Sequence, residues 1–466
     1  MENTVEYILN KLKESNVEYC EVRHEEVEND SFVLKNSNPE LSGCGSESGI
    51  GIRYTINGSL GFISLNDFDK KKIDEILNKS IRLTKNCKKL TDYTNFGEGQ
   101  INIDKYKVKE KIKLDSITPD VSLEVLKSLD NDIKKDAQSR FLSLNKSMSK
   151  KLFMNNDGCK IYSEIPRVGI MYLLTLIEGT KSLQRYAYVG ASGGWESLEN
   201  IQLNQKLKEE VSALKKALEF GKKIKEDKMD VVCGPEVTGI AVHESVGHPY
   251  EADRIFGRES AQAGESFINP SYIGKQIGNE MVNVVDDPTI ENGFGYYLYD
   301  DEGIKARRKF LMKDGKVNEF LHNRETAAAM KIKSNGSSRA SDYDKEAIVR
   351  MSNTFMLPGK FDEKEKIEDV KKGVYIKNFM EWNIDDRRWQ QKYVGSEAYM
   401  IEEGEITKPV LNPILEITTP ALYSSIDAVG KKVQHFAGQC GKGEPMQGIP
   451  VWMGGPMIRL KNIHIK

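Results

Sequence analysis

The sequence predicts an α+β protein, with an N-terminal α/β region followed by a β-rich, curved or barrel-like C-terminal domain that carries a histidine-bearing helix. Three observations support this prediction. Helical periodicity alternates with strand patterns in the first half of the chain, and sequence patterns typical of two strands joined by a turn dominate the second half. Glycine and proline recur throughout the last part of the sequence, as is typical of a closed or strongly curved sheet.

The first part of the chain is expected to form a small α/β unit. Apolar residues at helical spacing predict helices over 1–15 and 69–85. Asn57-Gly58 is the strongest short signal for a two-residue hairpin turn, and apolar strands flank it. The strands expected here are 17–27, 49–56 and 59–65.

A second α/β pattern follows a polar connector. A helix is predicted over 122–135, and Asp157-Gly158 marks another hairpin turn. The expected strands are 141–148, 151–165 and 167–179. A long helix then carries an apolar stripe, which we expect to pack on its own sheet: Leu203, Leu207, Val211, Leu214 and Leu218.

A short charged stretch without core residues, 221–230, predicts the main domain boundary near residue 225. The predicted domains are therefore an N-terminal α/β domain over 1–225 and a β-rich C-terminal domain over 226–466. Within the first, 1–90 and 110–225 are candidate subdomains. In the second, strand–turn–strand phrases surround Asp314-Gly315 and Glu403-Gly404.

The composition bounds the partners and the compartment. Lysine and arginine (68) nearly balance aspartate and glutamate (70), so nothing attracts nucleic acid or an anionic membrane. No apolar run approaches membrane-spanning length. The six cysteines lack a disulfide-like rhythm and indicate reduced thiols. We therefore expect a cytoplasmic protein with no nucleic-acid or membrane partner.

His243, Glu244 and His248 spell H-E-x-x-x-H, one residue longer than the H-E-x-x-H pattern of zinc proteases. On a straight α-helix, positions i and i+5 lie about 140° apart, too far round to share a metal. A local widening to i→i+5 hydrogen bonding, a π-bulge, would bring them onto one face. Gly247 and Pro249 weaken the helix at this point, so a bulge, kink or end is expected there.

A zinc site with two histidines needs a third protein ligand, because the fourth position is left for water. Thiolate and carboxylate both bind zinc, so the chemistry alone ranks Cys440 and Glu251 level. The other candidates are Asp253, His435, His322 and His464. Glu251 or Asp253 is also a candidate to orient a ligating imidazole. The alternative to all of these is a pair of histidines that binds no metal.

Several stretches together resemble the TldD/PmbA (TldD/TldE) metalloprotease family, in its TldD-like, metal-bearing branch. They lie at residues 50–64, 153–158, 243–253, 299–303, 353–359, 396–410 and 440–444. The resemblance implies that His243, His248 and Cys440 are metal ligands and that Glu244 is the catalytic glutamate. It also implies an N-terminal α/β region and a β-rich C-terminal domain that encloses the site. The sequence departs from the pattern at 378–395, an atypical loop where relatives tend to be glycine-rich and polar.

The predicted function is a zinc-dependent peptidase that hydrolyses peptides or unfolded polypeptide segments with metal-activated water. One Zn²⁺ per chain is expected, with other divalent transition metals as alternatives. The resemblance implies a homodimer, or a heterodimer with a TldE-like paralogue. The alternative function is a non-catalytic, partner-binding scaffold of the same family with a structural or absent metal. Glu244 favours the peptidase, because a structural site needs no base beside its ligand.

Overall fold

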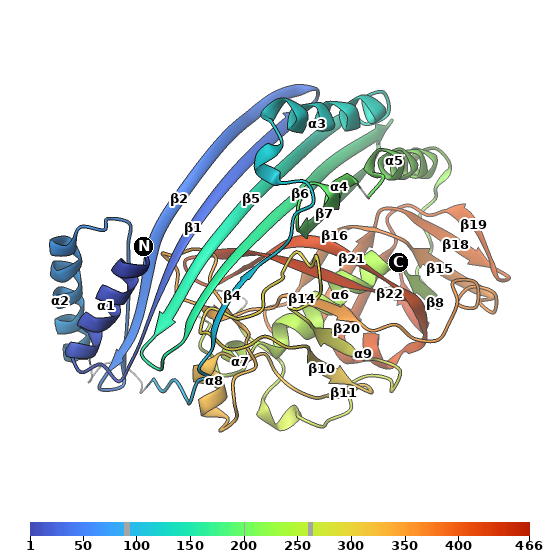
Figure 1. Ribbon diagram of the computed structural model, residues 1–466. Coiled ribbons are helices and arrows are strands. Elements are labelled where there is room, and N and C mark those ends of the chain that lie inside the picture. The colour runs from blue at the N-terminus through green and yellow to red at the C-terminus, as the bar shows by residue number, and fades with distance from the viewer. Residues whose placement is uncertain (88–93, 200, 260–263) are drawn as a thin grey trace.

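Two large β-sheets organise the chain, and a computed structural model describes them over residues 1–87, 94–199, 201–259 and 264–466. The first sheet has seven strands in the order β3-β2-β1-β5-β6-β4, with β7 also paired to β6. It curves strongly, and the second half of the chain lies to one side of it (Figure 1). Its strands are β1 (Tyr19–Lys35), β2 (Asn38–Ile56), β3 (Ser59–Leu65), β4 (Ile103–Lys107), β5 (Ser139–Asn155), β6 (Lys160–Glu178) and β7 (Lys181–Ser192).

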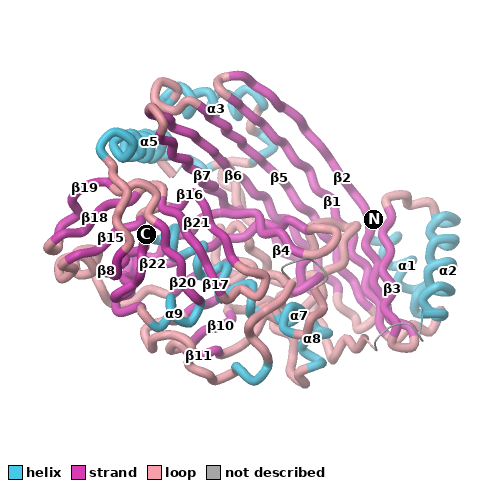
Figure 2. The backbone as a smooth tube through the Cα atoms, turned by 180° about the vertical axis from the view of Figure 1, so that it is seen from behind, coloured by secondary structure: helices cyan, strands magenta, loops and turns pink. Residues whose placement is uncertain are grey.

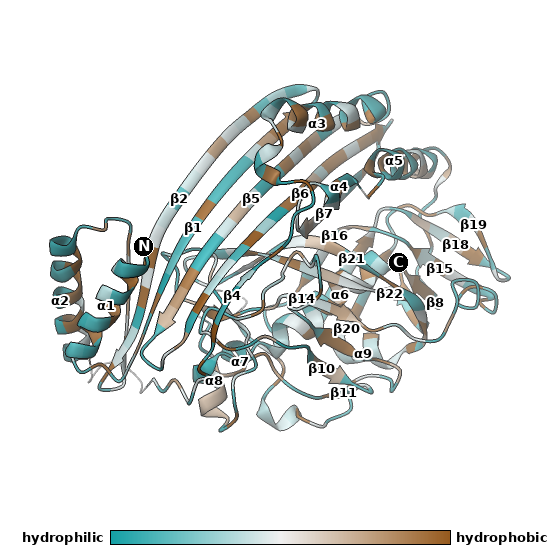
Figure 3. Ribbon diagram, in the orientation of Figure 1, coloured by the Kyte–Doolittle hydropathy of each residue, from teal (hydrophilic) through white to brown (hydrophobic). Residues whose placement is uncertain are grey.

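Four strands of this sheet are longer than the sequence predicted. β5 runs without a break from Ser139 to Asn155, across the gap expected between 141–148 and 151–165. β6 likewise runs without a break from the end of the expected 151–165 segment into 167–178. Cross-strand ion pairs between β1 and β5 explain the continuity, because they replace apolar packing with charge pairing. Lys146 Nζ lies 3.0 Å from Asp30, and Lys150 Nζ lies 3.3 Å from Glu26. Hydrophilic residues, coloured teal, recur along these strands in Figure 3.

Helices pack at both ends of the first sheet (Figure 1). Near one end, α1 (Glu2–Glu14) and α2 (Lys70–Asn86) cover a core that contains Ile8, Ile52 and Leu77. At the other end lie η2 (Leu114–Ser116), α3 (Pro119–Ile133), α4 (Glu196–Glu199) and α5 (Leu203–Phe220). The stripe of α5 is buried in the same core as β6, as the sequence predicted.

The second sheet has thirteen strands, and its central path is β11-β10-β9-β14-β22-β8-β15-β18-β19. The hairpins predicted at Asp314-Gly315 and Glu403-Gly404 are present as β10–β11 and β18–β19. The strands are β8 (Asp227–Cys233), β9 (Val284–Asp286), β10 (Lys309–Lys313), β11 (Lys316–Val317), β14 (Asn353–Met356), β15 (Lys372–Ile376), β16 (Phe379–Ile384), β17 (Gln390–Gly395), β18 (Ala398–Glu402), β19 (Glu405–Pro409), β20 (Ile414–Thr418), β21 (Ile426–Lys442) and β22 (Gln447–Ile465).

The histidine-bearing helix, α6 (Pro235–Val242), packs on β21 and β22 of this sheet. The predicted α+β fold class is therefore confirmed, with the helix carried by the β-rich part. The smaller elements around it are η3 (His243–Gly247), η4 (His248–Tyr250), α7 (Ala252–Ile255), η5 (Pro270–Tyr272), α8 (Arg324–Ala329), α9 (Thr419–Ser424), and the paired β12 (Ser338–Arg339) and β13 (Ile348–Val349). None of the helices in the described ranges is both long and apolar enough to cross a bilayer.

Segment 378–395 is a β-hairpin and not the loop that the sequence analysis expected. β16 pairs with β17, and β17 pairs in turn with β20. Asp385 stabilises the turn, because its carboxylate accepts hydrogen bonds from the backbone N–H groups of Trp389 (2.8 Å) and Gln390 (3.0 Å).

The two halves of the chain meet where β7 lies beside β16 and β21, seen from behind in Figure 2. Elsewhere a buried ion pair joins the two halves, because Arg53 of β2 lies 2.6 Å from Glu302 of the second half. Arg53 also lies 2.8 Å from Glu21 of its own sheet. Since a buried charge that loses its partner costs several kcal/mol, about 3–5, this pair fixes the position of the first sheet on the second half.

Candidate metal centre

The helix that carries both histidines changes its geometry at the first of them. α6 ends at Val242, and His243–Gly247 forms one π-helical turn that continues into the 3₁₀ turn η4. Of the bulge, kink or end expected at this point, the structure shows the π-bulge. The extra residue in the turn turns the two imidazoles toward each other, so that their ring centroids lie 4.9 Å apart. Gly247 is also closely packed, because a Cβ there would collide with the sulfur of Met351 unless that side chain shifts.

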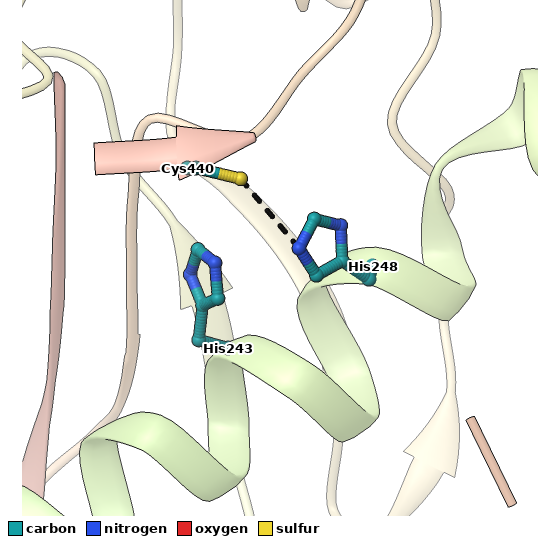
Figure 4. A group of neighbouring side chains, drawn as sticks. All are labelled: His243, His248 and Cys440. Carbon is teal, nitrogen blue, oxygen red and sulfur yellow. Dashed lines mark hydrogen bonds between the residues drawn. The ribbon is translucent and has the colours of Figure 1, made fainter. Parts of the chain in front are cut away.

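Cys440 approaches the two histidines from β21 (Figure 4). Its Sγ lies 3.5 Å from Nε2 of His248. One ligand atom from each of His243, His248 and Cys440 lies within 4.8 Å of the others, and all three residues are buried. One sulfur and two imidazole nitrogens form a donor set that zinc sites use. Nδ1 of His243 is buried and has no hydrogen-bond partner among the described residues.

The surroundings of Cys440 favour its thiolate. Burial raises the pKa of the thiol, but the neighbouring His248 and the Arg350 guanidinium lower it more, to about 7. Arg350 is itself fully buried and donates to the backbone carbonyl oxygens of Cys440 and Gln447. Because only the thiolate is a good metal ligand, a buried cation at this position prepares the sulfur for coordination.

Glu251 contacts the far side of the His248 ring. Its Oε2 lies 3.0 Å from Nδ1 of His248, so Nε2 is the nitrogen that faces Cys440. Burial raises the pKa of Glu251, but Lys442, His248 and Arg254 hold it well below its ordinary value. The buried Lys442 ammonium lies 3.3 Å from Glu251 and 2.7 Å from Asp253. A carboxylate behind a ligating histidine fixes its tautomer and orientation.

The remaining candidates from the sequence have other partners. His435 stacks on Trp452 with ring centroids 5.0 Å apart. Nδ1 of His322 lies 3.1 Å from the Thr326 hydroxyl, and His464 pairs with Glu226 at 3.1 Å. Over residues 1–87, 94–199, 201–259 and 264–466, the group of neighbouring donors is His243, His248 and Cys440.

Both oxygens of the Glu244 carboxylate are held by the hairpin β16–β17. Trp382 Nε1 donates to Oε1 at 3.2 Å, and Arg388 Nη1 donates to Oε2 at 2.6 Å. Burial raises the pKa of Glu244, but His248, Arg388 and His243 lower it more, so the net shift is downward. Trp382 and Arg388 were not predicted from the sequence. The available signal was the departure of 378–395 from the family pattern, in a stretch rich in tryptophan and arginine.

A pocket of about 240 Å³ opens over this cluster. Among its lining residues are Glu244, Cys440 and Arg388 from the second half, and Tyr186 and Tyr188 from β7 of the first sheet. A second cavity of about 530 Å³ lies between the first sheet and the second half and shares Tyr186, Tyr188 and Gln439 with the pocket. The two spaces therefore adjoin at the boundary between the halves of the chain.

Three family models match the chain in order: the PmbA/TldA metallopeptidase domain 1 over residues 20–84, its central domain over 102–225, and its C-terminal domain over 226–466. The last alone spans more than half of the sequence. The chain belongs to the PmbA/TldD metallopeptidase family. The resemblance found in the sequence is thus confirmed.

Relatives of this PmbA/TldD family member are metalloproteases by name. A metalloprotease of Methanocaldococcus jannaschii is 31% identical over 454 residues, covering 95% of this chain and 96% of the relative. A zinc metalloprotease TldD homolog of Saccharolobus solfataricus is 23% identical over 472 residues, covering 98% of both.

Solved structures share the fold along the whole chain. A candidate modulator of DNA gyrase from Thermotoga maritima has a TM-score of 0.81 at 17% identity and covers 100% of both chains. TldE of Thermococcus kodakarensis has a TM-score of 0.75 at 15% identity and covers 99% of both. At these low sequence identities, the two solved structures show a shared fold and nothing beyond it.

Proposed function

We propose that this PmbA/TldD family member is a zinc-dependent peptidase that hydrolyses peptides or unfolded polypeptide segments. The observation that carries the proposal is the π-helical turn, which turns His243 and His248 toward Cys440 and leaves Glu244 between them at the pocket. The names of the relatives support a metalloprotease. Zinc is the preferred ion because it suits a cysteine and two histidines, with cobalt, nickel or iron as alternatives.

In this proposal His243, His248 and Cys440 hold one ion per chain, and Glu251 keeps Nδ1 of His248 protonated so that Nε2 faces the ion. When bound, zinc lowers the pKa of a water molecule and polarises the scissile carbonyl. Glu244 accepts a proton from the attacking water and later delivers it to the leaving nitrogen, as a general base and then a general acid. The downward shift of its pKa keeps the carboxylate ionised.

The first prediction concerns Glu244. Glu244→Gln should keep the metal, because the ligand atoms are unchanged, and should lose most peptide hydrolysis, by at least about 10²-fold, because the base is gone. Metal analysis and cleavage of a fluorogenic peptide, with and without a chelator, measure both. Glu265→Gln, at an exposed glutamate whose side chain is 71% accessible, is the control. Cleavage by Glu244→Gln at the wild-type rate would disprove the proposed mechanism.

We further propose that the chain acts in the cytoplasm as a homodimer or as a heterodimer with a TldE-like paralogue. All six cysteines are unpaired, which suits a reducing compartment. The likeness to TldE of Thermococcus kodakarensis supports a TldE-like partner of the same fold.

A further inference from the structure

The hairpin turn at residues 385–390 holds a cation inside the candidate active site. The Arg388 side chain is only 12% accessible, and it lines the same pocket as Glu244, His248 and Cys440. Its partner in the structure is the Glu244 carboxylate, 2.6 Å from Nη1. Nε of Arg388 is buried and has no hydrogen-bond partner among the described residues. A buried donor without a partner is unfavourable, so the presence of this side chain in the pocket needs an explanation.

The backbone of Arg388 is held rigidly in an uncommon conformation. Its φ of 63° lies in the left-handed region, which residues other than glycine rarely adopt. The Thr419 hydroxyl donates to the Arg388 carbonyl at 2.8 Å, and the Arg388 N–H donates to the Asp385 carbonyl at 2.9 Å. The next residue is anchored too, because the Trp389 ring packs on Phe267 with centroids 5.2 Å apart. The guanidinium therefore belongs to a residue whose backbone position is fixed by these contacts.

We propose that Arg388 is a further catalytic residue, whose guanidinium stabilises the oxyanion that forms on the scissile carbonyl. This inference rests on the proposed peptidase function. Water adds to the carbonyl carbon, the carbonyl π pair moves onto the oxygen, and one water proton goes to Glu244. When the pair returns, the C–N bond breaks and Glu244 gives its proton to the leaving nitrogen. Arg388 stays protonated throughout.

Geometry supports this role. The attacking water must lie within hydrogen-bond reach of Glu244, and the oxyanion arises one carbon atom away from that water. Arg388 touches the same carboxylate and lines the same pocket, so its guanidinium lies beside the volume in which the carbonyl is placed. A fixed, partly desolvated cation aimed at developing charge is worth far more than a mobile one in water.

The test separates contact with the oxyanion from mere support of Glu244. A peptide with a phosphinate in place of the scissile amide mimics the tetrahedral oxyanion, and its binding to the zinc-loaded protein is measured by calorimetry. Arg388→Ala should lower kcat by about 10²-fold with little change in KM, and should weaken phosphinate binding similarly. The same weakening should appear in the Glu244→Gln background, where ordinary peptide binds without cleavage and should be unaffected.

Arg387→Ala is the matched control, because the neighbouring side chain is exposed and its pair with Glu265 is a loose one of 3.8 Å. Arg388→Lys keeps the charge and should recover part of both losses; if the alanine variant fails to fold, the lysine variant with reduced phosphinate affinity carries the test. Alanine shares the cost of the left-handed backbone, but the variant leaves the buried Glu244 carboxylate without its ion partner. The thermal midpoint should therefore fall, while the metal content should stay close to wild type.

Three results would overturn the inference: unchanged phosphinate binding in Arg388→Ala, equal loss for phosphinate and ordinary peptide, or a loss that vanishes in the Glu244→Gln background. These differ from failure of the proposed function. If wild-type protein cleaves no peptide, or Glu244→Gln cleaves as well as wild type, the peptidase proposal itself falls.

Discussion

At the scale of single residues, two buried cysteines in the second half of the chain have opposite environments. Burial alone raises the pKa of the Cys233 thiol to about 12, whereas His248 and Arg350 beside Cys440 lower its pKa to about 7. The spacing of residues in the sequence could not reveal this difference, because His248 and Arg350 reach Cys440 only through the fold. For the same reason, the chemistry of the residue types left Cys440 and Glu251 level as third ligand.

We predict that Cys440→Ser loses metal affinity, zinc-dependent thermal stabilisation and peptide hydrolysis together, because serine offers zinc a poor ligand in place of a thiolate. Cys233→Ser is the control and should keep its metal. Metal analysis with thermal unfolding, at several zinc concentrations, gives the answer. If Cys440→Ser keeps full metal content, then Glu251 becomes the third ligand to examine.

At the scale of elements, local signals in the sequence were sufficient for hairpins and helices and insufficient for strand length. The π-helical turn followed from the i, i+5 spacing with Gly247 and Pro249. The long strand β5 was divided in the prediction, because its lysines find their acidic partners on the neighbouring strand β1. The hairpin β16–β17 was missed because Asp385 and the pairing with β20 fix it.

Gly247→Ala is predicted to disturb the π-helical turn. A Cβ at this position meets the sulfur of Met351, and overpacking of a buried site costs about 1–3 kcal/mol. We expect a lower free energy of unfolding and a weaker affinity for zinc, since His248 is the next residue. Denaturant unfolding and metal titration measure the two effects.

Gly45→Ala is the control for this change, because nothing lies within 4 Å of the Cβ that it would add. A Gly247→Ala protein with wild-type stability and zinc affinity would show that the turn tolerates the added methyl group.

At the scale of the whole molecule, the pocket needs both halves of the chain, since β7 contributes Tyr186 and Tyr188. The boundary near residue 225 and the roles of His243, Glu244, His248 and Cys440 stay predictions. The fold class and the family could be predicted because the motifs are spread along nearly the whole sequence. The contact between the halves could not, since it depends on pairs such as Arg53–Glu302 that are distant in the sequence.

We predict that the purified protein is a dimer, or becomes one with a TldE-like partner. Light scattering should give twice the chain mass of 52.7 kDa, or a matching increase when the partner is added. A mass of one chain that no such partner changes would contradict this prediction.

The position of β22 in the second sheet has a consequence for biosynthesis. This strand is made after the other strands of its sheet, yet it lies between β14 and β8 and also pairs with β20 and β21. On the ribosome the sheet therefore stays open until β22 emerges, and β21 brings Cys440 to the two histidines only as that closure proceeds. Until β22 has emerged, the nascent chain is thus expected to hold an unfinished site, so the proposed peptidase activity should appear only when this region has been translated.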